Sequence, residues 1–224
     1  LRELCKINGL RWIRILYCYP EEITDELIQV IKEEPKICHY LDLPIQHASD
    51  RILKRMGRRT SKEQLIETIE KLRREIPDIA LRTTLITGFP GETQEQHEEL
   101  MDFVDQMEFD RLGVFTYSPE EDTPAASMPD QIPEEVKEDR QAELMELQQD
   151  IVFDQAEDRI GEELLVMIEG KVADENAYVG RTYRDAPNVD GLIFVNTSEE
   201  LMSGDFARVK VTGSADYDLI GELL

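Results

Sequence analysis

The sequence predicts an α/β domain of parallel strands, then a connecting helix, then a small all-β barrel. Over residues 1–129, segments rich in β-branched and aromatic residues alternate with segments of helical periodicity, which is typical of parallel βα units in an open sheet or part of a barrel. Residues 130–159 form one acidic helical segment with Pro133 in its first turn. Residues 160–224 contain short apolar runs separated by Gly, Asn and Asp, as in small barrels.

The elements of the first domain follow from local signals. Its expected strands are residues 12–19, 40–46, 80–87 and 111–117. Helices should begin after Thr24, Ser61 and Thr93, and the last two are each followed three residues later by Gln, which completes a capping box. A shorter helix is expected from Asp50 to Met56.

The net charge of the chain limits which classes of molecule it is expected to bind. The chain has 49 acidic residues against 25 Lys and Arg, a net charge of -24, so nucleic acid is disfavoured as the main ligand and a basic protein is favoured. The expected barrel alone holds 13 acidic and 5 basic residues. One basic cluster stands out, either as a solvated helix face or as a contact to an acidic group: Arg51, Lys54, Arg55, Arg58, Arg59 and Lys62.

Cysteine usage and hydropathy indicate in which cellular compartment the protein is expected. The three cysteines are scattered without metal-type spacing, which predicts a reduced, cytoplasmic protein. No apolar stretch approaches the length of a membrane span, so no membrane contact is expected. The chain opens on what reads as mid-domain sequence, and we therefore expect a fragment of a longer protein.

The candidate site lies where the strands end, because parallel βα folds collect binding residues there. The turn Gly88–Thr93 is the sharpest signal: its glycines allow close backbone approach and the next helix offers free N–H groups, although an ordinary tight turn fits equally well. Arg82 and Thr84 should share a strand face, where the arginine needs an anionic partner, either a ligand carboxylate or Asp42.

The remaining polar residues predict neither a catalytic nor a metal site. The three histidines lack metal-ligand spacing; we expect His47 to hydrogen-bond a turn and His97 to lie on a helix surface. No serine triad, P-loop or dinucleotide fingerprint is present. From these residues alone, the prediction is a small-molecule site in a barrel-like domain.

Three long motifs resemble a known family. YLDLPIQHASDRILKRMGRR, LRTTLITGFPGET and FDRLGVFTYSPEEDTPAA are similar to the second half of the radical S-adenosylmethionine (SAM) barrel of the methylthiotransferases. The barrel after residue 160 resembles the OB-like TRAM domain of those enzymes. The resemblance implies a partial, open TIM-like barrel with the last four of six strands.

The resemblance also implies cofactors and site residues. The family uses SAM and two four-iron four-sulfur clusters, and cleavage of SAM yields a radical that activates the substrate carbon. By position, the SAM residues would be the following: Gln46, Arg82, Thr84, Gly88, Pro90, Gly91, Phe115 and Tyr117. The cysteine triplet that binds the radical-generating cluster has no counterpart here, so the ligands should lie outside this chain and the isolated fragment should be inactive.

One loop separates two substrate classes within the family. Enzymes acting on transfer RNA typically carry an Asn-Arg pair after the Gly-Arg-Thr of the TRAM domain, whereas this chain has Asp185 and Ala186 in a loop fixed by Pro187. The resemblance thus implies methylthiolation of an aspartate β-carbon in the small-subunit ribosomal protein S-twelve. The loop residues expected to contact that protein are Tyr183, Asp185, Pro187 and Asp190. The alternatives are a transfer-RNA adenosine methylthiotransferase and a cluster-less module that only binds a ribosomal protein; a monomer is expected.

Overall fold

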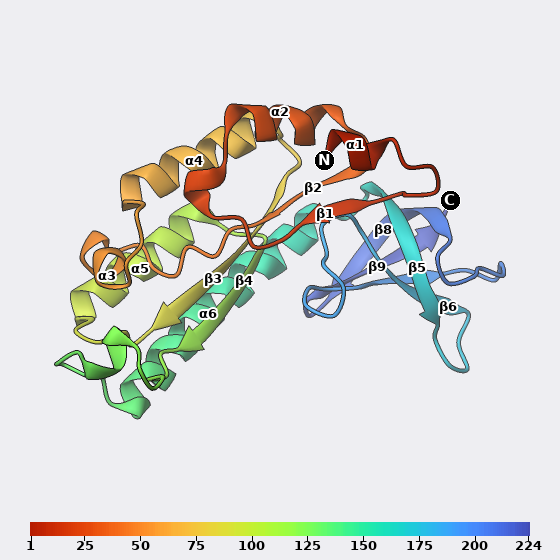
Figure 1. The fold of residues 1–224 in the computed structure, drawn as a ribbon. Coiled ribbons are helices and arrows are strands. Elements are labelled where there is room, and N and C mark those ends of the chain that lie inside the picture. The colour runs from red at the N-terminus through yellow and green to blue at the C-terminus, as the bar shows by residue number, and fades with distance from the viewer. The chain divides into compact units, whose positions relative to one another are not determined.

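The computed structural model describes residues 1–224 and divides them into two compact units, 1–148 and 149–224. The first unit is an open four-stranded parallel sheet in the order β1-β2-β3-β4, and the second contains a closed five-stranded barrel in the order β5-β6-β7-β9-β8. The predicted fold class, a partial barrel followed by a small β-barrel, is thus confirmed (Figure 1).

The elements of the first unit alternate as the sequence predicts. They are α1 (Arg2–Cys5), β1 (Ile13–Ile15), a 3₁₀ turn (Pro20–Glu22), α2 (Asp25–Glu33), β2 (Ile37–Asp42), α3 (Asp50–Arg55), α4 (Lys62–Glu75), β3 (Ala80–Thr87), α5 (Gln94–Met107), β4 (Arg111–Thr116), a second 3₁₀ turn (Pro124–Ser127) and α6 (Glu134–Asp158). Both predicted capping boxes are present, at Ser61 and at Thr93.

Two strands end several residues before the predicted position, and β2 also begins earlier, at Ile37 instead of residue 40. β1 stops at Ile15 because Tyr17 has φ of 58°, a left-handed conformation that leaves the strand geometry. β2 ends at Asp42, but the chain continues beside β3. Leu43 N donates to Arg82 O (2.8 Å), and Gln46 N donates to Thr84 O (2.9 Å). The extended course to residue 46 therefore survives without a regular ladder.

The two faces of the sheet differ in burial. Along β3, alternate residues from Leu81 to Thr87 are buried, whereas Arg82, Thr84 and Ile86 on the opposite face are only half-buried. The buried face carries α2 and α4, which lie side by side in Figure 1, together with α5. The half-buried face is the one that would line a barrel interior, and it leads to the strand ends where the candidate site lies.

The second unit is a barrel with a dry interior. Its strands are β5 (Glu163–Lys171), β6 (Ala177–Arg181), β7 (Ile193–Asn196), β8 (Phe206–Ala215) and β9 (Asp218–Leu223). Inward residues alternate along them and form an apolar core that includes Val166, Ile168, Ile193 and Val209, all with no exposed surface. Gly180 is required in this core, because a Cβ there would lie 2.6 Å from Val166 Cγ1.

Candidate functional site

A pocket of about 610 Å³ opens at the carboxyl ends of the parallel strands. One part of its lining is apolar and aromatic, from Ile86, Phe89, Phe115 and Tyr117 at the ends of β3 and β4. Phe89 and Tyr117 meet edge to face, with ring centroids 5.2 Å apart. A pocket of this volume and composition is typical of a site for a drug-sized ligand that contains a planar ring.

Two polar atoms in this lining lack partners. Gln46 Oε1 and the Tyr117 hydroxyl are buried without a hydrogen bond. Gln46 also holds φ at 73°, a left-handed conformation that is costly for a non-glycine residue and is common at functional sites. A buried polar group without a partner costs free energy, and the chain itself satisfies neither atom.

The eight predicted SAM residues separate into groups. Gln46, Phe115 and Tyr117 are brought together around the pocket. Arg82 and Thr84 lie together lower on β3, outside the pocket lining, with Arg82 Nη1 3.4 Å from Thr84 Oγ1. Gly88, Pro90 and Gly91 lie in the turn beyond the end of β3, where backbone N–H groups are hydrogen-bonded within the chain, as described below.

Arg82 has an internal carboxylate partner. Its Nη1 lies 3.0 Å from Asp42 Oδ1, and both side chains are largely buried. Asp42 also accepts a hydrogen bond from Tyr17 N at 3.3 Å. Of the two partners that the sequence allowed, the structure therefore supplies Asp42, and the electrostatic need of the arginine is met without a ligand carboxylate.

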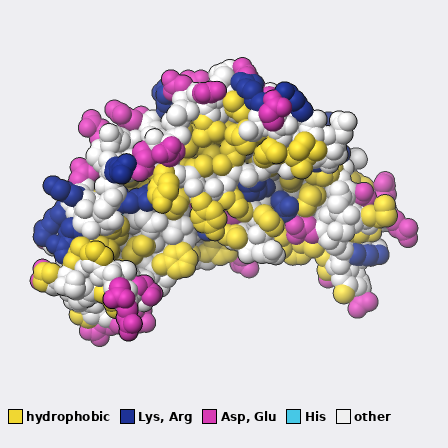
Figure 2. Space-filling model, in the orientation of Figure 1, with side chains coloured by type: hydrophobic (Ala, Val, Ile, Leu, Met, Phe, Trp, Pro, Cys, Tyr) yellow, Lys and Arg dark blue, Asp and Glu magenta, His cyan; other side chains and the backbone are white.

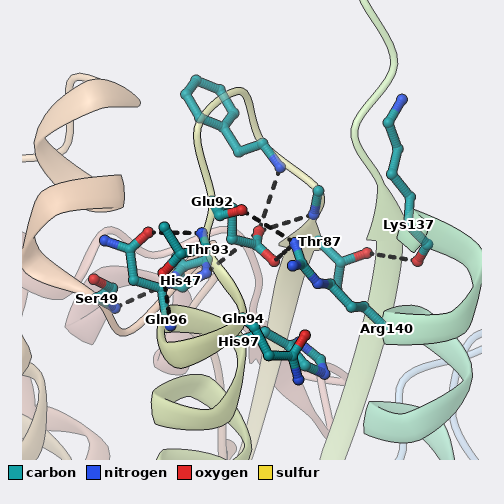
Figure 3. A network of polar contacts seen from close by, with 12 residues as sticks. His47, Ser49, Thr87, Glu92, Thr93, Gln94, Gln96, His97, Lys137 and Arg140 are labelled. Atoms are coloured by element: carbon teal, nitrogen blue, oxygen red, sulfur yellow. Dashed lines mark hydrogen bonds and ion pairs between the residues drawn. The ribbon is translucent and has the colours of Figure 1, made fainter. Parts of the chain in front are cut away.

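The turn Gly88–Thr93 is held by its own glutamate. Glu92 Oε2 accepts hydrogen bonds from Gly88 N at 2.8 Å and from Phe89 N at 3.3 Å, so these N–H groups are already satisfied (Figure 3). Gly91 N donates to Asp130 O at 2.8 Å. Gly88 and Gly91 both have positive φ, which explains the glycines. The N–H groups at the start of the turn are therefore occupied by Glu92. The N–H groups of the following helix, which were expected to be free for an anion, are a separate set, and among them Gln96 N is bonded to Thr93 Oγ1 at 3.4 Å.

Arg140 and His47 complete the Glu92 cluster. Arg140 Nη1 reaches Glu92 Oε1 at 2.9 Å, and both side chains are almost fully buried. His47 Nδ1 accepts from Ala48 N and Ser49 N, each at 2.9 Å, which confirms its role in a turn and leaves the proton on Nε2. That nitrogen faces Glu92 Oε2 at 3.5 Å. The cluster ties the ends of β2 and β3 to α6.

Sequence reasoning missed the cationic face of α6. Lys137 is buried, and its Nζ donates to Tyr117 O at 2.8 Å, directly behind the pocket. Arg140, Leu144 and Gln148 are buried on the same face. A usable signal was present: the only two bases between residues 130 and 158 stand at helical spacing with Leu144, in a segment otherwise rich in acids.

The expectation that His97 lies on a helix surface is wrong. It is 1% exposed, and its Nε2 lies 2.7 Å from Glu143 Oε2 of α6. Residue 97 falls on the side of α5 that α6 covers, and periodicity alone does not reveal that a second helix packs there.

The predicted partner loop of the barrel presents fewer carboxylates than expected. Asp185 is buried, and its Oδ2 accepts from Thr182 Oγ1 at 2.7 Å. Asp190 Oδ2 accepts from Ala186 N at 2.8 Å. Both carboxylates thus hold the loop from within, and the expectation that Asp185 displays its charge to a partner is wrong. Pro187 and its two followers form the exposed tip, and Tyr183 is half-buried.

The cysteines and the other acidic groups form no metal site. No group of three or more His, Cys, Asp or Glu side chains is arranged to hold a metal ion. Cys38 is buried, whereas Cys5 and Cys18 are half-buried. Burial, together with the nearby Asp42 carboxylate, raises the pKa of the Cys18 thiol.

Two family models match this chain. The radical SAM superfamily model matches residues 1–104, and the TRAM domain model matches residues 160–224. No helix has the length and apolar character needed to cross a membrane. Among solved structures, coproporphyrinogen III oxidase HemN from Escherichia coli, a radical SAM enzyme, superposes with a TM-score of 0.50 at 19% identity over 65% of this chain and 32% of its own, a likeness of fold.

Curated relatives match over the whole chain. The "ribosomal protein uS12 methylthiotransferase RimO" of Lachnoclostridium phytofermentans is 67% identical over 221 residues, which are 99% of this chain and 50% of the relative. The protein of the same name from Geobacter sulfurreducens is 53% identical over 225 residues, again half of its length. The chain is thus similar over its whole length to proteins named as methylthiotransferases, its first part matches the radical SAM superfamily model, and it spans about half the length of the curated relatives it matches.

Proposed function

We propose that the chain supplies the SAM pocket and the TRAM domain of a RimO-type methylthiotransferase, which attaches a methylthio group to the β-carbon of an aspartate in ribosomal protein uS12. The observation that carries this proposal is the pocket at the strand ends, with aromatic walls and two unpartnered buried polar atoms. The match over 99% of the chain to a protein named for this activity supports the same assignment. A ribosomal substrate also places the reaction in the cytoplasm.

The residues present fit the nucleoside part of SAM. Phe115 and Tyr117 would flank the adenine ring, and the Tyr117 hydroxyl and Gln46 Oε1 would hydrogen-bond the polar atoms of the ligand. Lys137, bonded to Tyr117 O, and the Glu92 cluster would keep these strand ends in place. When bound with a reduced cluster, SAM supplies a radical able to remove a hydrogen atom from an unactivated carbon.

The chain itself does not fit an iron–sulfur cluster. It offers no set of closely placed cysteine ligands, so no step of the reaction is assigned to a cluster on these residues. We place the ligands of both clusters in other parts of the protein, and we expect the isolated chain to bind SAM without turning it over.

The charge of the barrel supports a basic protein partner over transfer RNA. Two of its five cations are held within the fold: Arg181 Nε lies 2.7 Å from Glu169 Oε1, and Arg184 is buried. Lys210 stands between Glu163 and Glu222 in the strand register. The exposed cations Lys171, Arg208 and Lys210 stand against 13 acids in this barrel, so phosphates, whose contacts dominate nucleic-acid affinity, would meet a mostly negative surface. The exposed acids, Glu199 and Glu200 among them, would instead attract a Lys- and Arg-rich protein.

Calorimetric titration of the 224-residue chain with SAM tests the pocket. We expect Phe115→Ala to weaken SAM about tenfold, the scale of lost aromatic stacking, and the matched Tyr217→Ala in the second unit to leave it unchanged. Equal affinity of both variants would contradict the assignment.

A parallel titration with uS12 and with transfer RNA tests the partner. Protein uS12 should bind more tightly, and reversal of Glu199 and Glu200 to Lys should slow its association at low salt more than at high salt. Tighter binding of transfer RNA would favour the adenosine-modifying alternative.

A further inference from the structure

The remaining part of the pocket lining contains two arginines, which the SAM assignment does not use. Arg55 at the end of α3 and Arg58 just after it both line the cavity. Figure 2 shows Lys and Arg side chains gathered over the region of α3. In a chain with about two acids per base, a pair of half-buried arginines beside a pocket requires an explanation.

Neither arginine has a carboxylate partner. Arg55 Nη2 contacts only the sulfur of Met128, at 3.7 Å, and methionine sulfur is a weak acceptor. Arg58 Nη2 donates to Pro44 O at 2.6 Å, and its guanidinium lies over the Tyr19 ring at 5.0 Å. The Nε atoms of both arginines are buried without any hydrogen-bond partner. Two arginines that line one cavity thus each carry an N–H donor that the chain does not satisfy.

The position of Arg55 is fixed by the backbone next to it. A Cβ on Gly91 would lie 3.2 Å from Arg55 Cζ, so the guanidinium packs closely on the Pro90–Gly91 turn, which glycine permits. Arg58 is held by the carbonyl of Pro44, just before the strained Gln46. Both cations are therefore positioned before a ligand arrives, as a site that recognises charge requires.

We propose that the guanidinium groups of Arg55 and Arg58, which the chain leaves incompletely hydrogen-bonded, bind the carboxylate of the substrate aspartate and so select an acidic residue in the pocket that also receives SAM. This inference rests on the proposed function, because it names the group that recognises the substrate of that reaction. A carboxylate matches guanidinium geometry and charge, and its binding would hold the adjacent β-carbon in place beside the cofactor. A neutral asparagine would leave the donors with a weaker acceptor.

Nitrogen-15 NMR of the 224-residue chain tests the proposal, because the Arg Nε–H signals report their own hydrogen bonds. The probe is N-acetyl-L-aspartate N-methylamide, and its control is the corresponding asparagine derivative. We expect the aspartate probe to shift the Nε signals of Arg55 and Arg58, and the asparagine probe to bind about tenfold more weakly or worse, as loss of charge-assisted hydrogen bonds implies. Equal responses to the two probes would overturn the proposal.

Variants give an independent measurement. The double variant Arg55→Gln with Arg58→Gln should lose the aspartate response by about tenfold or more, on the same grounds. Arg51 and Arg59 are exposed cations of the same segment and serve as controls. Their replacement by Gln should change the response to the aspartate probe by less than about twofold, because exposed charges are screened. If the double variant does not fold, the comparison of the two probes on the unaltered chain still decides.

Titration with SAM separates this inference from the proposed function. If SAM shifts pocket signals while the aspartate probe still moves both Nε signals, both proposals are supported. If SAM itself moves the two Nε signals and displaces the probe, the arginines hold the cofactor carboxylate and the inference is wrong. If SAM binds and the aspartate probe has no effect, the inference is wrong and the proposed function stands. If the probe binds and SAM does not, the proposed function is wrong and the binding of a carboxylate by the arginines stands. Stronger shifts from adenosine monophosphate than from the aspartate probe would indicate a phosphate site and would also refute the inference.

Discussion

Removing Arg140 should destabilise the first unit far more than removing a partly exposed cation. In the variant Arg140→Met, Glu92 would keep its hydrogen bonds from Gly88 N and Phe89 N but lose the guanidinium 2.9 Å away. The Glu92 side chain is 0% exposed, so water cannot replace the lost partner. Methionine has a similar length and no charge, which confines the change to electrostatics.

The magnitude follows from this burial. Breaking a buried ion pair by removing one partner costs about 3–5 kcal/mol, because a charge is left uncompensated in a low-dielectric environment. The partly exposed pair of Lys62 and Glu99, 3.3 Å apart with side chains 28% and 36% exposed, serves as the matched control. Lys62→Met should cost about 0–1 kcal/mol. Adding Glu92→Gln to Arg140→Met should recover part of the loss, since it removes the stranded charge.

Urea unfolding followed by tryptophan fluorescence measures this difference. The chain has a single tryptophan, Trp12, which lies in the first unit and reports its unfolding separately from the barrel. With a slope of about 2 kcal/mol per molar urea, a loss of 3–5 kcal/mol lowers the midpoint by roughly 1.5–2.5 M. A midpoint for Arg140→Met within about 0.5 M of that for Lys62→Met would refute the view that this cluster holds the strand ends.

Three further outcomes follow from individual positions. Gly88→Ala should cost more than about 2 kcal/mol in thermal unfolding, because a Cβ there would overlap Lys137 at positive φ, whereas Gly57→Ala, with positive φ but open space around it, should cost about 1 kcal/mol. Asp185→Ala should destabilise the barrel by about 1–3 kcal/mol through its lost internal hydrogen bonds, and an unchanged melting temperature would contradict this. The raised pKa of Cys18 leaves less thiolate at a given pH, so this thiol should react with a disulfide reagent at pH 8 more slowly than free cysteine, and a faster reaction would contradict its environment.

Much of the architecture was determined by the sequence itself. The strand Ala80–Thr87 and the two capping boxes were predicted at the residues where the structure has them, because strand alternation and helix caps depend on neighbours within a few positions. The short apolar runs after residue 160 predicted a small barrel for the same reason, and the structure has a closed barrel there. The pocket residues at the strand ends could also be anticipated, since parallel strands bring their carboxyl ends to one edge.

Only the tertiary structure decided which polar groups are already satisfied. Asp42 neutralises Arg82, Glu92 fills its own turn, and Asp185 is buried within the loop that was expected to display it. Each outcome depends on a side chain's environment in the folded chain, which the local pattern does not specify. The unpaired Nε groups of Arg55 and Arg58 became visible in the same way, because a missing partner can be recognised only after folding has placed every candidate partner elsewhere.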